Sequence, residues 1–212
     1  MLTLYYHPLS SFCWKVLIAL DEREVPFTPR LVDLGDAADR AAFARVWPLA
    51  KFPVLVDEAA GRTLPESSII IEYLDRIGDA PPMIPPDPDA ALAVRLRDRL
   101  FDAYLHLPMQ KLGEDRRRPE AARDPAGVAH AEALVRAAYA EAEAAIGDGP
   151  WVMGARFGLA DCSAFPALFY VSRHVPLAEH PRLAAYLDRL MQRPSVARTL
   201  AAAQPWMHLV PA

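Results

Sequence analysis

The pattern of hydrophobic and polar positions changes along the chain, and the change falls near residue 80. Before it, short apolar stretches bounded by turn residues predict strands, and segments whose apolar residues recur every three or four positions predict helices. We therefore expect strands at Leu2–Tyr6, Phe27–Val32, Val54–Asp57 and Arg62–Leu64, and helices at Phe12–Glu24, Ala37–Val46 and Glu66–Ile77.

A cluster of prolines between Ala80 and Pro88 separates this part from a longer one without strand signals. The sequence predicts an α/β domain over residues 1–78, a linker over 79–87 and an all-α domain over 88–212. Pro108 should end or kink the first helix of the second domain, because proline lacks an N–H and clashes with the preceding turn. The expected helices are Pro88–Gln110, Pro125–Ile146, Leu159–Val171, Pro181–Met191 and Val196–Ala203.

Composition narrows the functional classes. A chain of 212 residues with 53% hydrophobic residues can bury a sizeable core, and a net charge of −4 gives no reason to expect nucleic acid or an anionic membrane as partner. The two cysteines, Cys13 and Cys162, are far apart and predict reduced thiols, a cytoplasmic location and no metal site. We see no signal peptide and no stretch near the roughly 20 apolar residues of a membrane span.

The segment that carries most chemistry begins the last helix of the first domain. Glu66, Ser67 and Ser68 precede an apolar repeat, so their side chains and the free N–H groups of the first turn should face outward. Helix N-termini bind carboxylates, and Glu66 can bind an ammonium group, so the site fits a zwitterionic peptide. The alternative is that Glu66 and Ser67 only cap the helix. The expected buried face is Ile69, Ile70, Tyr73, Leu74 and Ile77.

Pro53 begins the strand that precedes this helix. A proline is tolerated at the first residue of a strand, where no ladder N–H is needed. A cis Phe52–Pro53 bond would turn the Phe52 backbone N–H and C=O away from the sheet, toward an extended peptide ligand. An ordinary trans proline at a strand start is the alternative.

Two serines, Ser10 and Ser11, precede the first helix. A thiol placed there would meet a hydroxyl donor and the positive end of the helix dipole, and both favour the thiolate. A hydrogen bond to a charged group, worth roughly 1.5–3 kcal/mol, lowers a thiol pKa by about one to two units. That change is enough to make the thiolate a dominant species near pH 7, because an ordinary thiol has a pKa of about 8.5.

These motifs together resemble the cytosolic glutathione S-transferase family over nearly the whole chain, including its serine-type bacterial members. The resemblance implies an N-terminal thioredoxin-like, glutathione-binding domain followed by an all-helical domain, which is the glutathione transferase fold. The motifs are Leu2-Thr3-Leu4-Tyr5-Tyr6, His7-Pro8-Leu9-Ser10-Ser11, Lys51-Phe52-Pro53, Glu66-Ser67, Gly158-Leu159-Ala160-Asp161 and Arg193-Pro194.

The resemblance also implies roles for the residues of the first loop. Ser10 aligns with the activating hydroxyl of the serine-type classes, and Ser11 is then the simple N-cap. Ser11, Tyr6, Tyr5 and the absence of any single donor are the alternatives. Cys13 would matter in a cysteine-type relative, but its place on the apolar helix face favours a buried structural thiol.

The glutathione-binding residues implied by the resemblance are Phe52, Pro53, Glu66, Ser67 and Lys51. Two departures from the family pattern stand out. The usual Asn-Pro is replaced by Trp47-Pro48-Leu49-Ala50 before Lys51, so Lys51 either pairs with the glycine carboxylate or is an exposed strand-end residue. Gly158 replaces the Ser or Thr of a capping box, which leaves Asp161 to accept from the Gly158 N–H in a folding motif.

A second substrate should bind in an apolar cleft between the domains. Arg116-Arg117-Arg118 has the composition of an anion site, although a solvated helix end is the default interpretation. The candidate residues of the cleft lie on the first loop, the long helix and the C-terminal segment: Leu9, Phe12, Tyr104, Leu107, Met109, Phe169 and Trp206.

The resemblance implies a detoxification enzyme that joins glutathione, as co-substrate, to a small apolar electrophile without a tightly bound cofactor. The alternatives are a glutathione-dependent isomerase or lyase and a noncatalytic interaction module of the same fold. The family also forms two-fold dimers. We therefore expect a homodimer whose interface contains Trp47, Leu49 and the helical segment Arg95–Tyr104.

Overall fold

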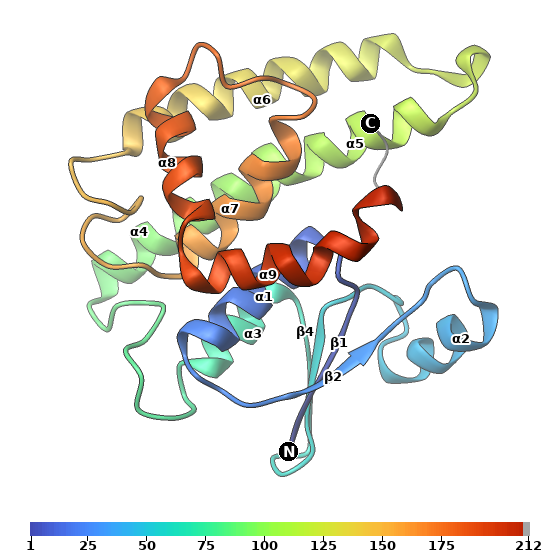
Figure 1. The fold of residues 1–212 in the computed structure, drawn as a ribbon, viewed down its shortest axis with the longest axis vertical. Coiled ribbons are helices and arrows are strands. Elements are labelled where there is room, and N and C mark those ends of the chain that lie inside the picture. Colours follow the sequence, from blue (N-terminus) through green and yellow to red (C-terminus); the bar gives the residue numbers. More distant parts are fainter. Residues whose placement is uncertain (210–212) are drawn as a thin grey trace.

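The computed structural model describes residues 1–209, so residues 210–212 of the predicted helical domain lie outside the described part. A small sheet with its own helices lies beside a larger group of helices, and α1 lies where the two parts meet (Figure 1). This arrangement confirms the predicted thioredoxin-like domain followed by an all-helical domain.

The N-terminal part contains a four-stranded sheet in the order β2-β1-β3-β4. Strand β1 is parallel to β2 and antiparallel to β3, and β3 is antiparallel to β4. The predicted elements all appear, with ends that differ by a few residues. They are β1 (Leu2–Tyr6), α1 (Ser11–Glu22), β2 (Thr28–Leu31), α2 (Ala37–Val46), β3 (Val54–Asp57), β4 (Arg62–Pro65) and α3 (Ser67–Leu74).

Alternation along the strands divides the core of this domain between two faces. Leu4 and Leu55 belong to the large core that α1, α3 and the helical domain share. Their strand neighbours Tyr5 and Val54 belong to a smaller cluster around Phe43 of α2. Successive strand side chains point to opposite faces, so helices cover both sides of the sheet.

The helical part follows the sequence prediction closely. Helix α7 is buried along nearly its whole length and lies in the centre, where α1 of the other domain packs against it. No helix among residues 1–209 is both long and apolar enough to cross a bilayer. The elements are α4 (Pro88–Arg99), η1 (Leu100–His106), α5 (Leu107–Arg117), η2 (Glu120–Ala122), α6 (Pro125–Ala145), α7 (Leu159–Val171), α8 (Pro181–Met191), α9 (Pro194–Ala203) and η3 (Gln204–Leu209).

Pro108 does not end the first helix of the second domain, which was one of the two predicted effects. The helix that begins at Pro88 continues to Arg117, and the departure from α-helical geometry precedes the proline, as the π-helical segment η1. There the Leu107 N–H donates to the Asp102 carbonyl, five residues back. Widening the helix before Pro108 accommodates a residue that lacks an N–H and would crowd the preceding turn.

The Gly158 motif forms as predicted. The Asp161 carboxylate accepts from the Gly158 N–H at 3.0 Å, and it also accepts from the Val152 N–H at 3.0 Å. A Cβ at Gly158 would lie 2.5 Å from the Met83 carbonyl oxygen. Glycine therefore replaces the usual hydroxyl residue because the linker passes too close for any side chain.

Candidate functional site

The first loop places Ser10 at the N-terminus of α1. Ser10 has extended backbone angles, and its Oγ accepts from the Cys13 N–H at 3.3 Å. Ser10 is therefore the N-cap residue, and the expectation that Ser11 caps the helix was wrong. Ser11 lies in the first turn and is buried. The loop is held by a bond from the Ser10 N–H to the His7 carbonyl at 3.0 Å.

The capping bond uses only part of the hydrogen-bonding capacity of the Ser10 hydroxyl. A serine hydroxyl has two acceptor lone pairs and one O–H donor, and the cap uses only an acceptor position. The first-turn N–H groups of α1 at Ser11 and Phe12 have no intrahelical partner, as at any helix N-terminus. The site therefore retains an O–H donor and the positive end of a helix dipole for an incoming anion.

Cys13 and Tyr6 have environments unlike that of Ser10. Cys13 is fully buried, and desolvation raises the pKa of its thiol to about 12 even though Ser10 and the His7 backbone oppose that shift. Burial also raises the pKa of Tyr6 above its usual value. A thiol that stays protonated inside the core is a packing group, as the apolar face of α1 predicted.

The Phe52–Pro53 peptide bond is cis. The antiparallel pairing of β3 with β4 begins at Val54, opposite Pro65, so the polar backbone groups of Phe52 lie outside the sheet ladder. The Phe52 side chain packs against the smaller core cluster around Phe43, while Lys51 is exposed. The turn thus anchors one side chain and leaves backbone donor and acceptor groups at the edge of the domain.

The start of α3 has unusual backbone geometry. Glu66 is exposed and adopts a φ of 71°, a left-handed conformation that costs a non-glycine residue about 1–3 kcal/mol. It occupies the N-cap position without a side-chain capping bond. The simple capping explanation for Glu66 therefore fails, and strain of this kind is typical of ligand-binding positions.

The predictions for three residues of the same helix were wrong. Ser68 does not face outward, because its Oγ donates to Asp98 at 2.8 Å and accepts from Lys15 at 3.0 Å. Ile69 is not buried but 51% exposed, and Ile71 takes its place in the core. Ser67 is also more enclosed than expected, since it is buried. The helix is rotated relative to the predicted face because it packs on α1.

A buried ionic network beneath Ser68 joins the two domains, and the sequence analysis missed it. The Lys15 ammonium of α1 lies 2.8 Å from Asp98 and 2.7 Å from Asp102, and Lys15 is completely buried. Desolvation alone would raise the pKa of Asp98, but the charge of Lys15 and its hydrogen bonds lower it. Ser163 of α7 also donates to Asp98, at 2.5 Å. The sequence did contain a signal for this network: Lys15 lies within an apolar helix face, and Asp98 and Asp102 are four residues apart on another helix.

The buried residue His106 was also missed in the sequence analysis. It is completely buried at the end of η1, and its ring stacks on Phe12 with centroids 4.3 Å apart. Neither ring nitrogen has a hydrogen-bond partner among the described residues. Burial, reinforced by Lys15, lowers the pKa of His106 to about 3, so the imidazole is neutral.

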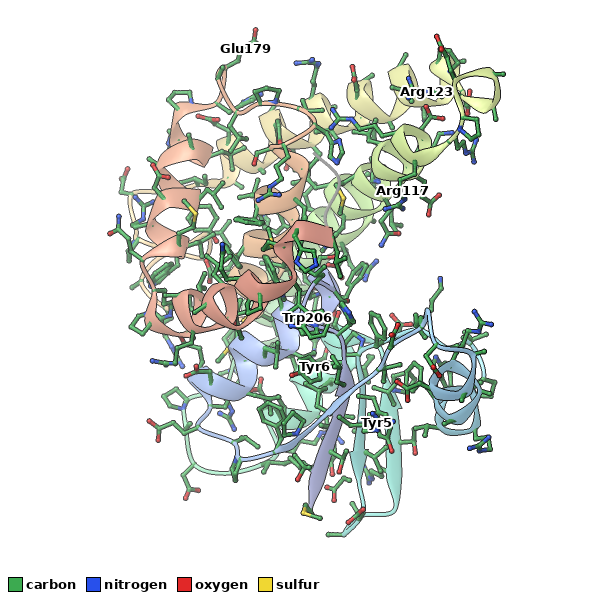
Figure 2. The ribbon with its side chains drawn as sticks, turned by 45° about the vertical axis from the view of Figure 1, so that its right-hand side comes forward. Tyr5, Tyr6, Arg117, Arg123, Glu179 and Trp206 are labelled. Carbon is green, nitrogen blue, oxygen red and sulfur yellow. The ribbon has the colours of Figure 1, made fainter. Side chains whose placement is uncertain are left out.

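The predicted second-substrate residues fall into two groups. The Leu9 carbonyl accepts from the Tyr170 hydroxyl of α7 at 2.9 Å, and Phe12 in the first turn of α1 stacks on His106 of η1. Trp206 lies edge-on to His7 at 5.4 Å, and Figure 2 shows it close to the Tyr6 end of the sheet. Met109 and Phe169 are partly buried against the core. Tyr104 and Leu107, by contrast, are 49% and 51% exposed.

Comparison with known proteins agrees with the observed fold. The chain matches the glutathione S-transferase N-terminal domain over residues 4–82 and the C-terminal domain over residues 125–189. A glutathione S-transferase of Methylobacterium radiotolerans, solved in complex with glutathione sulfonate, is 34% identical over 93% of each chain, with a TM-score of 0.83.

Two curated relatives are more distant and differ in name. The probable glutathione S-transferase parC of Nicotiana tabacum is 28% identical over 90% of this chain and 85% of its own. The probable maleylacetoacetate isomerase 2 of Drosophila melanogaster is 25% identical over 95% of this chain and 88% of its own. Since the two family domains together match most of the chain, the protein belongs to the glutathione S-transferase family.

Proposed function

We propose that the protein binds glutathione, holds it as the thiolate at Ser10 and directs that thiolate at an electrophilic carbon of a small apolar compound. The observation that carries the proposal is the state of Ser10. Its Oγ is fixed by the bond from the Cys13 N–H. Its O–H has no acceptor among residues 1–209 and can donate at the positive end of α1.

The peptide would bind along the edge formed by the Phe52–Pro53 turn and the start of α3. The Phe52 backbone N–H and C=O lie outside the sheet and would pair with the cysteinyl backbone. Glu66 would bind the ammonium group, and Ser67 with the first-turn N–H groups would bind the adjacent carboxylate. Lys51 would pair with the glycine carboxylate. The Methylobacterium relative solved with glutathione sulfonate supports this ligand class.

The chemistry needs only proton removal and positioning. The bound thiol loses its proton to solvent, the Ser10 O–H stabilises the sulfur anion, and the sulfur attacks the electrophile to form a carbon–sulfur bond. The electron pair then leaves with a displaced group or is protonated on the neighbouring atom. Holding both reactants in one cleft supplies the remaining acceleration.

An isomerase is the second candidate, because one relative is named a probable maleylacetoacetate isomerase. In that case the same thiolate adds to a double bond and is expelled after rotation, so glutathione is not consumed. Measuring free thiol during turnover separates the two reactions. Glutathione-resin binding without turnover of any electrophile would instead indicate a noncatalytic module.

The central test is Ser10→Ala in the full-length protein. We expect the pKa of bound glutathione, followed by thiolate absorbance against pH, to rise by about one unit or more, because a charge-assisted hydrogen bond is lost. Ser11→Ala is the matched control and should leave that pKa unchanged. An unchanged titration in Ser10→Ala, or an equal rise in Ser11→Ala, would contradict the role given to Ser10.

A further inference from the structure

A pocket lies in the helical domain, and none of its lining residues belongs to the sheet domain. It is bounded by α5, α6 and the turns that follow α5 and α7, and its volume is about 140 Å³. We call it the distal pocket. Figure 2 shows Arg123, one of its residues, at the end of the helical domain remote from Tyr5 in the sheet. The distal pocket is therefore separate from the proposed thiol site.

Three cationic or potentially cationic side chains line the distal pocket: Arg116, Arg123 and His174. Within residues 1–209, neither guanidinium makes an ion pair or a side-chain hydrogen bond, although the neighbouring Lys111 and Arg118 both approach Asp115. The Nδ1 of His174 is enclosed and has no hydrogen-bond partner in the same part of the chain. The lining thus holds two exposed arginines without an ion pair and one imidazole nitrogen without a partner, within the described part of the chain.

The acidic residues of the lining do not neutralise these donors equally. Asp115 is buried and already accepts from the Asp124 N–H at 2.9 Å, with Lys111 and Arg118 each 4.0 Å away. Glu132 of α6 is the remaining acid of the lining. It offers an acceptor for a hydroxyl or an acidic proton of a ligand.

The electrostatic field at His174 has the sign that these contacts imply. Desolvation lowers the pKa of His174, and the charges of Arg116 and Arg173 lower it further. Of these two arginines, Arg116 also lines the pocket. An anion in the pocket would reverse that effect and raise the pKa of His174.

We propose that the distal pocket is a binding site for a small oxyanion, either a carboxylate or a phosphate group. Guanidinium groups present paired N–H donors whose spacing matches two oxygens of such an anion. A volume of about 140 Å³ corresponds to four or five waters at about 30 Å³ each, which is enough for one such group. Leu112 and Val128 add an apolar surface for a short carbon substituent.

The test titrates the full-length protein separately with inorganic phosphate and with acetate at constant ionic strength, maintained with chloride. Calorimetry measures binding, and ¹H–¹⁵N correlation of the imidazole follows His174. We expect at least one anion to bind saturably and to raise the pKa of His174. Arg116→Ala and Arg123→Ala should each weaken binding about tenfold or more, because a charge-assisted contact is lost.

Arg117→Ala is the matched control, since Arg117 is an exposed neighbour on α5 that does not line the pocket and its loss changes the net charge equally. It should bind the anion as wild type does. Selective binding of phosphate would assign a phosphate ester, and selective binding of acetate a carboxylate. The proposal is overturned if neither anion binds saturably, or if Arg117→Ala weakens binding as much as Arg116→Ala. It does not depend on whether Ser10 activates a thiol.

Discussion

Single side chains in this protein have properties that their types do not predict. Ser10 caps α1 and is also the proposed hydrogen-bond donor to the glutathione thiolate, because a hydroxyl can accept one hydrogen bond while it donates another. His106 shows the opposite case, a polar ring without a partner. Its stacking on Phe12 retains it in the core at the cost of an unsatisfied N–H.

His106 should make stability depend on pH. Its pKa is about 3 in the folded protein and about 6.5 in the unfolded chain, so the unfolded chain binds the proton first as pH falls. Its contribution to stability is complete above pH 6.5 and is lost as pH falls toward 3. The unfolding free energy of His106→Phe minus that of wild type should therefore be about 2 kcal/mol larger at pH 5 than at pH 8.

Denaturant unfolding at both pH values measures this difference, and comparing the variant with wild type cancels the titration of the other groups. His208→Phe is the control for the replacement of an imidazole by a phenyl ring, because His208 is exposed. Parallel stability curves for wild type and His106→Phe would show that His106 titrates normally in the folded protein.

At the scale of elements, helix starts decide where ligands and neighbouring segments fit. Two adjacent serines at the start of α3 have different environments. Ser68 bonds to Lys15 and Asp98, while Ser67 lies at the proposed carboxylate site. We expect Ser67→Ala to raise the glutathione dissociation constant roughly tenfold in calorimetry, with little change in stability. Ser68→Ala should keep the affinity but lose about 1.5–3 kcal/mol of stability. The reverse pattern would return Ser67 to a capping role.

At the start of α7, we expect a serine substitution to lower stability, although helix-capping preferences alone would predict a small increase. Serine is ordinarily a better N-cap than glycine by a few tenths of a kcal/mol. Here the new Cβ would lie 2.5 Å from the Met83 carbonyl oxygen, so Gly158→Ser should lose about 1–3 kcal/mol in denaturant unfolding. Gly147→Ser, where no atom lies within 4 Å of the added Cβ, is the control. A stabilised Gly158→Ser variant would show that the linker can move.

On the scale of the whole molecule, the domains are joined by α1 and by the Lys15 network, and some apolar surface remains uncovered. Leu49 is 66% exposed and Leu96 is 61% exposed. Trp47, expected to face a partner, instead packs on the Phe43 cluster. The predicted dimer therefore depends on Leu49 and the exposed face of the segment Arg95–Tyr104.

We expect light scattering at micromolar concentration to give the mass of a homodimer. Replacing Leu49 and Leu96 together with alanine should shift the protein toward monomer, since apolar area at the interface is lost. Met153→Ala, which removes a partly exposed apolar side chain elsewhere, should not. A monomer mass for wild type would refute the dimer, and a dimer that survives the double substitution would place the interface elsewhere.

The sequence by itself determined the order and type of the elements, because periods of two and of 3.6 residues are local properties. It also placed Ser10, Pro53 and Glu66 at the ends of elements, since caps, prolines and acids mark those ends. Only the tertiary structure decided that α3 is rotated to expose Ile69 and to turn Ser68 toward Asp98 and Lys15. It also brought Lys15 between Asp98 and Asp102, which lie more than 80 positions away along the chain. Burial and pairing of charges depend on which helices meet, and no local pattern encodes that meeting.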